Sequence, residues 1–164
     1  MIIGSVLENK NLENRIAITP DLVKKYISAG FETLIEEEFG VHLGILDNEF
    51  TKVGCKVEKR ENILKKSDIL LQLNLPDDKS LECLKDKSIV IGNFNVSQNF
   101  EKINKFKSKI SFFSLELLPR ITRAQSMDIL SSQANLAGYK AVVDSFAAYK
   151  KAIPMMMTAA GTIS

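Results

Sequence analysis

The sequence predicts an α/β fold. We expect an open, mostly parallel, doubly wound sheet of the Rossmann-like or flavodoxin-like kind, flanked by helices and followed by a long C-terminal linker helix. The first observation is that short apolar runs alternate with segments of helical periodicity, at the spacing of βαβ units. The second is that runs such as residues 68–73 are continuously apolar, as strands buried on both faces of a parallel sheet are.

The first elements are two strands, at residues 2–7 and 31–35, joined by a polar loop and a helix. Thr19 is suited to the N-cap position and Pro20 to the first helical turn. Gly30 can close the helix in a left-handed conformation. The apolar face of this helix consists of Leu22, Val23, Tyr26 and Ile27.

The next segment contains the single histidine of the chain, His42, in a loop at residues 40–44. A lone histidine is more often exposed or structurally bonded than catalytic, and its role stays open. We expect Asp47 to cap a short helix that Gly54 stops, with Phe50 and Val53 inward, and a strand at residues 55–57.

The remaining elements of the sheet continue the alternation. We expect, in order, a helix at 61–66, a strand at 68–73, a helix opened by Ser80, a strand at 88–92, a helix from Ser97 to Lys107 and a strand at 110–114. Phe100, Ile103 and Phe106 should face inward. Ligands bind at the carboxyl ends of strands in such sheets, and Arg15 and Arg120 both follow such ends.

The stretch from Glu116 to Lys140 concentrates reactive side chains in a loop that begins with a proline, between an apolar strand and a helix. Composition alone favours a solvated surface loop, although such loops often carry ligand contacts. A long helix should follow at residues 131–150, about 30 Å in length, and end before Pro154. Its stripe of small residues is Ala134, Ala137, Ala141, Ser145 and Ala148. The methionines at 155–157 are either core filling or a partner contact.

Composition excludes several classes of function. The formal net charge is only +2, with lysines interleaved among acids, so the sequence gives no case for nucleic-acid binding. Cys55, Cys83 and His42 are too few for a structural zinc site, and we expect no metal. No window approaches the ~20 apolar residues of a membrane span, so we expect no direct membrane insertion.

The dinucleotide fingerprint Gly-x-Gly-x-x-Gly does not occur in the sequence. Its glycines let the backbone approach a pyrophosphate at a helix N-terminus, so a conventional dinucleotide site is missing here. Any nucleotide bound by this chain therefore needs a phosphate anchor from elsewhere.

Three stretches carry a resemblance to a known family: Arg15-Ile-Ala-Ile-Thr-Pro20, the loop from Glu116 to Lys140, and Met155-Met-Met-Thr-Ala-Ala-Gly161. The chain closely resembles the alpha subunit of proton-translocating NAD(P) transhydrogenases, in the family that also contains alanine dehydrogenase. The resemblance covers essentially the whole chain. It implies that the glycine-rich turn follows where this sequence stops, so that the chain is the first domain of a larger protein.

The resemblance also implies site residues. Arg120, Gln125, Asp128 and Ser131 would bind the cofactor NAD(H), and Gln125 and Asp128 would serve the hydride-transfer step. Each has a structural alternative: a carboxylate at a helix N-terminus for Asp128, a helix cap for Ser131. Arg123 is evenly balanced between a site role and a surface charge, and the role of Arg15 stays open.

Two alternatives remain. The first is an amino-acid dehydrogenase of the alanine dehydrogenase kind, which needs a catalytic lysine and histidine where this sequence has Asn74 and Asn95. Neither asparagine can act as a general base near neutral pH, which favours the transhydrogenase. The second alternative is an interaction module without activity.

The resemblance gives the expected organisation as residues 1–130 for the N-terminal domain and 131–164 for the linker helix and the start of a connection. It implies an oxidoreductase that acts within a larger complex, with NADP(H) bound on a beta subunit and with proton-translocating membrane subunits. A homodimer is expected, as is a cytoplasmic place peripheral to the inner membrane. The isolated chain would be inactive.

Overall fold

The computed structural model describes residues 1–151, 156–159 and 161–163. The chain divides into two compact units, Met1–Leu118 and Pro119–Ser164, and each is described by itself below. The boundary expected after residue 130 stays a prediction.

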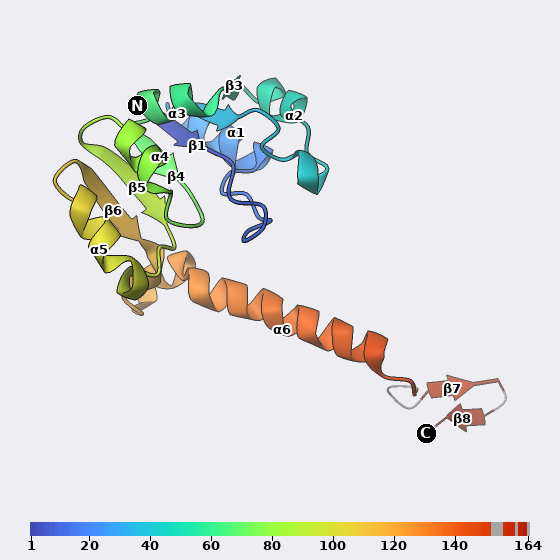
Figure 1. Ribbon diagram of the computed structural model, residues 1–164. Coiled ribbons are helices and arrows are strands. Elements are labelled where there is room, and N and C mark those ends of the chain that lie inside the picture. Colours follow the sequence, from blue (N-terminus) through green and yellow to red (C-terminus); the bar gives the residue numbers. More distant parts are fainter. Residues whose placement is uncertain (152–155, 160, 164) are drawn as a thin grey trace. The chain divides into compact units, whose positions relative to one another are not determined.

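The first unit is built on a six-stranded, all-parallel sheet with the order β3-β2-β1-β4-β5-β6 (Figure 1). This order confirms the predicted doubly wound sheet, because the chain starts at β1, winds outward to β3 and then returns to β4 on the other side of β1. The topological switch point therefore lies between β1 and β4. The strands are β1 (Ile2–Ser5), β2 (Glu32–Glu36), β3 (Lys56–Glu58), β4 (Ile69–Leu71), β5 (Ser88–Gly92) and β6 (Ile110–Ser114).

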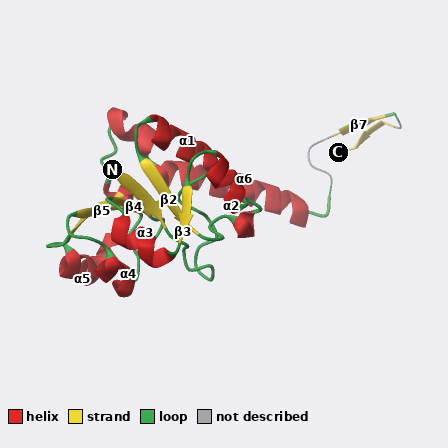
Figure 2. Ribbon diagram, turned by 90° about the horizontal axis from the view of Figure 1, so that it is seen from above, coloured by secondary structure: helices red, strands yellow, loops and turns green. Residues whose placement is uncertain are grey.

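Two hydrophobic cores cover the two faces of the sheet. One core joins Val23 of α1 and Phe50 of α2 to the side chains of β1 and β2. The other core joins Ile63 of α3 and Phe106 of α5 to the opposite face. Figure 2, seen from above, has α1 on one side of the strands and α4 and α5 on the other. The helices are α1 (Pro20–Ser28), the 3-10 helix η1 (Val41–Leu43), α2 (Asp47–Lys52), α3 (Arg60–Lys66), α4 (Asp78–Cys83), α5 (Val96–Phe106) and the 3-10 helix η2 (Leu115–Leu117).

The start of α1 is as predicted. Thr19 is the N-cap residue, Pro20 is the first helical residue, and Gly30 follows the helix with φ of 86°. Thr19 makes no side-chain capping bond. The proline, with its fixed φ, therefore carries this start rather than a hydroxyl cap.

Three predicted helix starts were wrong by one to three residues. The backbone of Leu46 is the N-cap of α2, and Asp47 is its first residue. Asp77 caps α4 by accepting a hydrogen bond of 2.7 Å from the Ser80 N–H. Asn95 precedes α5, and the Ser97 hydroxyl donates to the Asn95 side chain instead of capping. In each case another residue at the helix end took the place expected for the predicted cap.

The expectation that Phe100 faces inward was also wrong, since its side chain is 63% exposed. Each helical residue advances by about 100°, so Phe100 lies about 120° around the helix from Phe106. Phe106 is buried and Ile103 packs beside it, which sets the core-facing side of α5. Phe100 is thereby left on the flank.

The second unit contains the 3-10 helix η3 (Thr122–Met127), the long helix α6 (Ile129–Ala148) and an antiparallel hairpin of β7 (Met156–Thr158) and β8 (Gly161–Ile163). The predicted long helix is confirmed, two residues earlier at each end. Its stripe of small residues is exposed. Pro154 and Met155, which the sequence interpretation used, lie outside the described residues.

Candidate functional site

The candidate site lies within the second unit, where η3 passes into α6. Asp128 is the N-cap of α6, and its Oδ1 accepts a hydrogen bond of 3.0 Å from the Ser131 N–H. The Ser131 hydroxyl donates to Oδ2 of the same carboxylate at 2.6 Å. A carboxylate at this position satisfies an orphan donor of the first helical turn and lies at the positive end of the helix dipole. The structural alternative expected for Asp128 is therefore present.

The same contacts fix the charge of Asp128. The hydrogen bond from the Ser131 hydroxyl, and then that from the Ser131 N–H, lower the pKa of the Asp128 carboxyl. The positive charge of Arg120 lowers this pKa further. Asp128 is therefore an anion throughout the neutral range.

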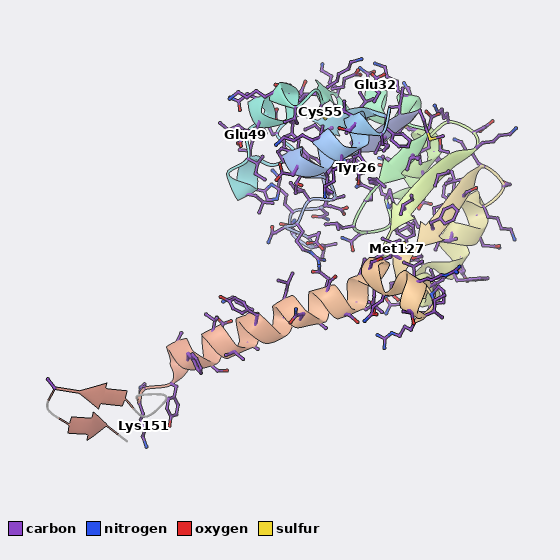
Figure 3. The ribbon with its side chains drawn as sticks, turned by 180° about the vertical axis from the view of Figure 1, so that it is seen from behind. Tyr26, Glu32, Glu49, Cys55, Met127 and Lys151 are labelled. Carbon is purple, nitrogen blue, oxygen red and sulfur yellow. The ribbon has the colours of Figure 1, made fainter. Side chains whose placement is uncertain are left out.

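A shallow, open hollow of about 400 Å³ lies against these residues. Three of the four predicted cofactor-binding residues, Gln125, Asp128 and Ser131, line it together. Arg120 does not line the hollow, although its charge acts on Asp128. The other lining residues are Ser126, Met127, Ile129, Ser132 and Asn135. Met127 is labelled in Figure 3 and is 54% exposed.

Sequence reasoning missed the polar residues Ser132 and Asn135 of this hollow. Their spacing from Asp128 was the available signal, because residues three, four and seven positions apart share one face of a helix. The predicted N-cap would have placed them beside Ser131. Gln125 and Asn135 are both exposed, so the hollow offers two side-chain amides to a ligand as well as the carboxylate.

A second hollow, of about 350 Å³, lies in the first unit at the carboxyl ends of β1 and β4. Asn74, which stands where the dehydrogenases need a lysine, lines it. Its side-chain amide donates to Glu8 Oε2 at 3.3 Å. Asn95, the other departure, lies in the left-handed region with φ of 47° at the start of α5. Both asparagines are therefore at the ligand edge of the sheet, without a base.

Arg15, also near this edge, forms a two-pronged ion pair with Glu13. Its Nε donates to Oε1 at 2.8 Å and its Nη2 to Oε2 at 2.6 Å. The Arg15 guanidinium holds the pKa of Glu13 at about 2. The pair orders the loop between β1 and α1.

The remaining candidates have structural roles. His42 Nε2 lies 2.7 Å from the Asn14 carbonyl oxygen, which links η1 to the loop after β1. Cys55 is buried, and burial raises the pKa of its thiol to about 12, so this thiol is inert. Within residues 1–151, 156–159 and 161–163, no group of three potential metal ligands occurs. No helix in that described part of the chain has the length and apolarity to cross a membrane.

Comparison with known proteins gives close relatives. The chain is 41% identical to an NAD(P) transhydrogenase alpha subunit of Rickettsia prowazekii, over 100% of this chain and 44% of the relative. It is 38% identical to the protein of the same name in Rhodospirillum rubrum, over 95% of this chain and 42% of the relative. The chain thus spans less than half the length of these relatives.

A solved structure agrees with these relatives. The transhydrogenase from Sinorhizobium meliloti matches 99% of this chain and 49% of its own, with a TM-score of 0.89 and 40% identity. Residues 4–137 match the family described as alanine dehydrogenase/PNT, N-terminal domain. That match takes in the whole sheet, η3 and the first turns of α6. The chain belongs to the alanine dehydrogenase/PNT N-terminal domain family, and within that family its close relatives are alpha subunits of NAD(P) transhydrogenases.

Proposed function

We propose that this chain is the portion of a transhydrogenase alpha subunit that contacts the nicotinamide end of NAD(H), through Gln125, Asp128, Ser131 and Arg120. The observation that carries the proposal is the hollow of about 400 Å³, lined by the first three of these residues. Its volume suits a portion of a dinucleotide rather than the whole.

The side chains of the hollow fit a nicotinamide and its ribose. The carboxamide of the ring has two N–H donors and a carbonyl acceptor, which a carboxylate and an amide can match. The Asp128 carboxylate accepts, and the Gln125 amide both donates and accepts. Because the chain has no glycine-rich phosphate turn, the pyrophosphate would be held by another part of the protein.

When bound, the nicotinamide supplies the hydride that a transhydrogenase passes to NADP⁺. The residues of this chain need not move a proton at the transferred hydrogen. Their task is to orient the ring and exclude water, which is the larger part of catalysis when two cofactors react directly. Gln125, at the exposed end of η3, is the side chain that would approach the second nucleotide.

The amino-acid dehydrogenase alternative is less well supported. Such an enzyme must take a proton from the substrate amine or alcohol. Asn74 and Asn95 lie at the edge where this base is needed, and neither can perform that task. The relatives named above are also transhydrogenases.

The proposal extends to the assembly. By similarity to proteins named subunit alpha, the chain would act beside an NADP(H)-binding beta subunit, membrane subunits that carry protons, and a second alpha subunit. Its place would be cytoplasmic and peripheral to the inner membrane.

Equilibrium binding of NADH tests the site. The protein is a complete alpha subunit in which this chain is joined to the remaining portion of the Rickettsia prowazekii relative. We expect Asp128→Asn and Ser131→Ala each to weaken NADH binding about tenfold, since hydrogen bonds to charged groups contribute about 1.5–3 kcal/mol.

Asp144→Asn is the matched control. Asp144 is an exposed carboxylate on the same helix, paired with Lys140 and outside the hollow. Circular dichroism should give equal helix content for all variants. NADH affinity equal to that of the unsubstituted protein in both Asp128→Asn and Ser131→Ala would remove these residues from the proposed site.

A further inference from the structure

Within residues 1–118, one half of one face of the sheet has no helix packed on it. On this face, α1 and α2 pack against β1, β2 and β3. Figure 3, seen from behind, has α1 in front of the first strands and, among the helices of this unit, none in front of β5 and β6. The helices α3, α4 and α5 belong to the other face.

The uncovered area is defined by the pairing of three parallel strands. Ile69, Ile89 and Ser111 are aligned across β4, β5 and β6, and so are Leu71, Ile91 and Phe113. Successive residues of a strand point to opposite faces, so these six side chains share one face. We call this set the open half-face: Ile69, Leu71, Ile89, Ile91, Ser111 and Phe113.

The two faces of β5 and β6 differ sharply in burial. On the covered face, Val90 and Ile110 are buried, and Phe112 packs edge-to-face on Phe94 with ring centroids 6.1 Å apart. On the open half-face, Phe113 is 57% exposed, and neither Ile89 nor Ile91 belongs to either core.

The open half-face contains five apolar side chains, one serine and no charge. Parallel sheets are found almost only with both faces covered, because their strands are apolar on both sides. An apolar patch of adjacent strands is therefore a docking surface rather than a solvated one.

We propose that the open half-face is covered by an amphipathic helix from the portion of the family's polypeptide that this chain does not contain. Three strands spaced by about 4.8 Å are about 10 Å across. This is the width of one helix, whose diameter with side chains is about 10–12 Å.

The length of the relatives supports this source. This chain corresponds to 44% and 42% of the two curated relatives, so more than half of each of those proteins lies outside the match. A return of the polypeptide to the first unit would complete the second layer of a doubly wound fold.

The experiment mixes two purified proteins. One is the 164-residue chain, and the other is the remaining portion of the Rickettsia prowazekii relative, beyond the segment that matches. We expect a 1:1 complex in size-exclusion chromatography with light scattering. Hydrogen exchange should slow at residues 88–92 and 110–114, and Phe113→Glu should weaken the complex at least tenfold.

Phe100→Glu is the matched control, because Phe100 is a similarly exposed phenylalanine on α5 and outside the open half-face. It should leave the affinity unchanged. Failure to form a complex, protection confined to other elements, or equal effects of both substitutions would overturn the proposal. Self-association of the chain alone that Phe113→Glu abolishes would overturn it too, by assigning the surface to a second copy.

Discussion

At the scale of residues, the site role and the capping role of Asp128 and Ser131 are compatible. The cap uses one contact on each carboxylate oxygen of Asp128, and each oxygen has a further lone pair. The sequence interpretation treated cap and ligand contact as alternatives. The cap observed in the structure fixes the orientation of the carboxylate, which a ligand contact also needs.

The ion pair of Glu13 and Arg15 gives a prediction at this scale. The folded-state pKa of Glu13, about 2, lies below its ordinary value. The stability from this pair is therefore fully present above the unfolded pKa of about 4.3, and is lost as pH falls toward 2. Carboxyl-carbon NMR titration should give a midpoint near 2 for Glu13.

The Arg15→Ala variant provides the comparison. Without the guanidinium, the Glu13 midpoint should rise toward its ordinary range, because the largest cause of the lowered pKa is the Arg15 hydrogen bond. A midpoint that stays near 2 in the Arg15→Ala variant would contradict this assignment.

At the scale of elements, the strands were more predictable than the helix ends. Residues 88–92 and 110–114 were predicted at their observed bounds, because continuous apolar runs are typical of parallel strands. The starts of α2, α4 and α5 were wrong because several polar residues compete for each N-cap. That competition is decided by packing, which a sequence pattern does not contain.

The packing of β1 on α3 is close enough to give a second prediction. A Cβ added at Gly4 would lie 2.0 Å from Ser67 Oγ and 2.8 Å from Ile63 Cγ2. The Ser67 hydroxyl is buried and donates to the Ile63 carbonyl at 2.6 Å, so it has little room to move. Gly4→Ala should lower the free energy of unfolding by about 1–3 kcal/mol, as overpacking does. Urea denaturation followed by circular dichroism measures this.

Gly138→Ala is the control for this substitution. Gly138 lies within α6 and nothing lies within 4 Å of its added Cβ. Alanine in a helix interior is more favourable than glycine by about 0.5–1 kcal/mol. A Gly4→Ala midpoint as high as that of Gly138→Ala would mean that the contact between β1 and α3 relaxes without cost.

At the scale of the whole molecule, the sequence predicted the sheet, the long helix and three residues of one hollow, but not the open half-face. Each strand was assigned from its own apolar run, and such a run does not reveal whether a helix covers it. Only the strand order and the two separate cores identify the uncovered residues Ile89, Ile91 and Phe113. The family match explains why the loop around Asp128 was found, since composition alone favoured a solvated surface.

The central claim is that the hollow beside α6 orients a nicotinamide for hydride transfer. The most direct measurement is the single-turnover rate of transfer from NADH to NADP⁺ in the complete complex, with Gln125→Asn in this chain. We expect the rate to fall at least tenfold while NADH affinity changes much less, because a displaced amide disturbs ring orientation more than binding. Gln98→Asn, an exposed glutamine on α5, should leave the rate unchanged. A Gln125→Asn enzyme that transfers hydride at the unsubstituted rate would contradict the account.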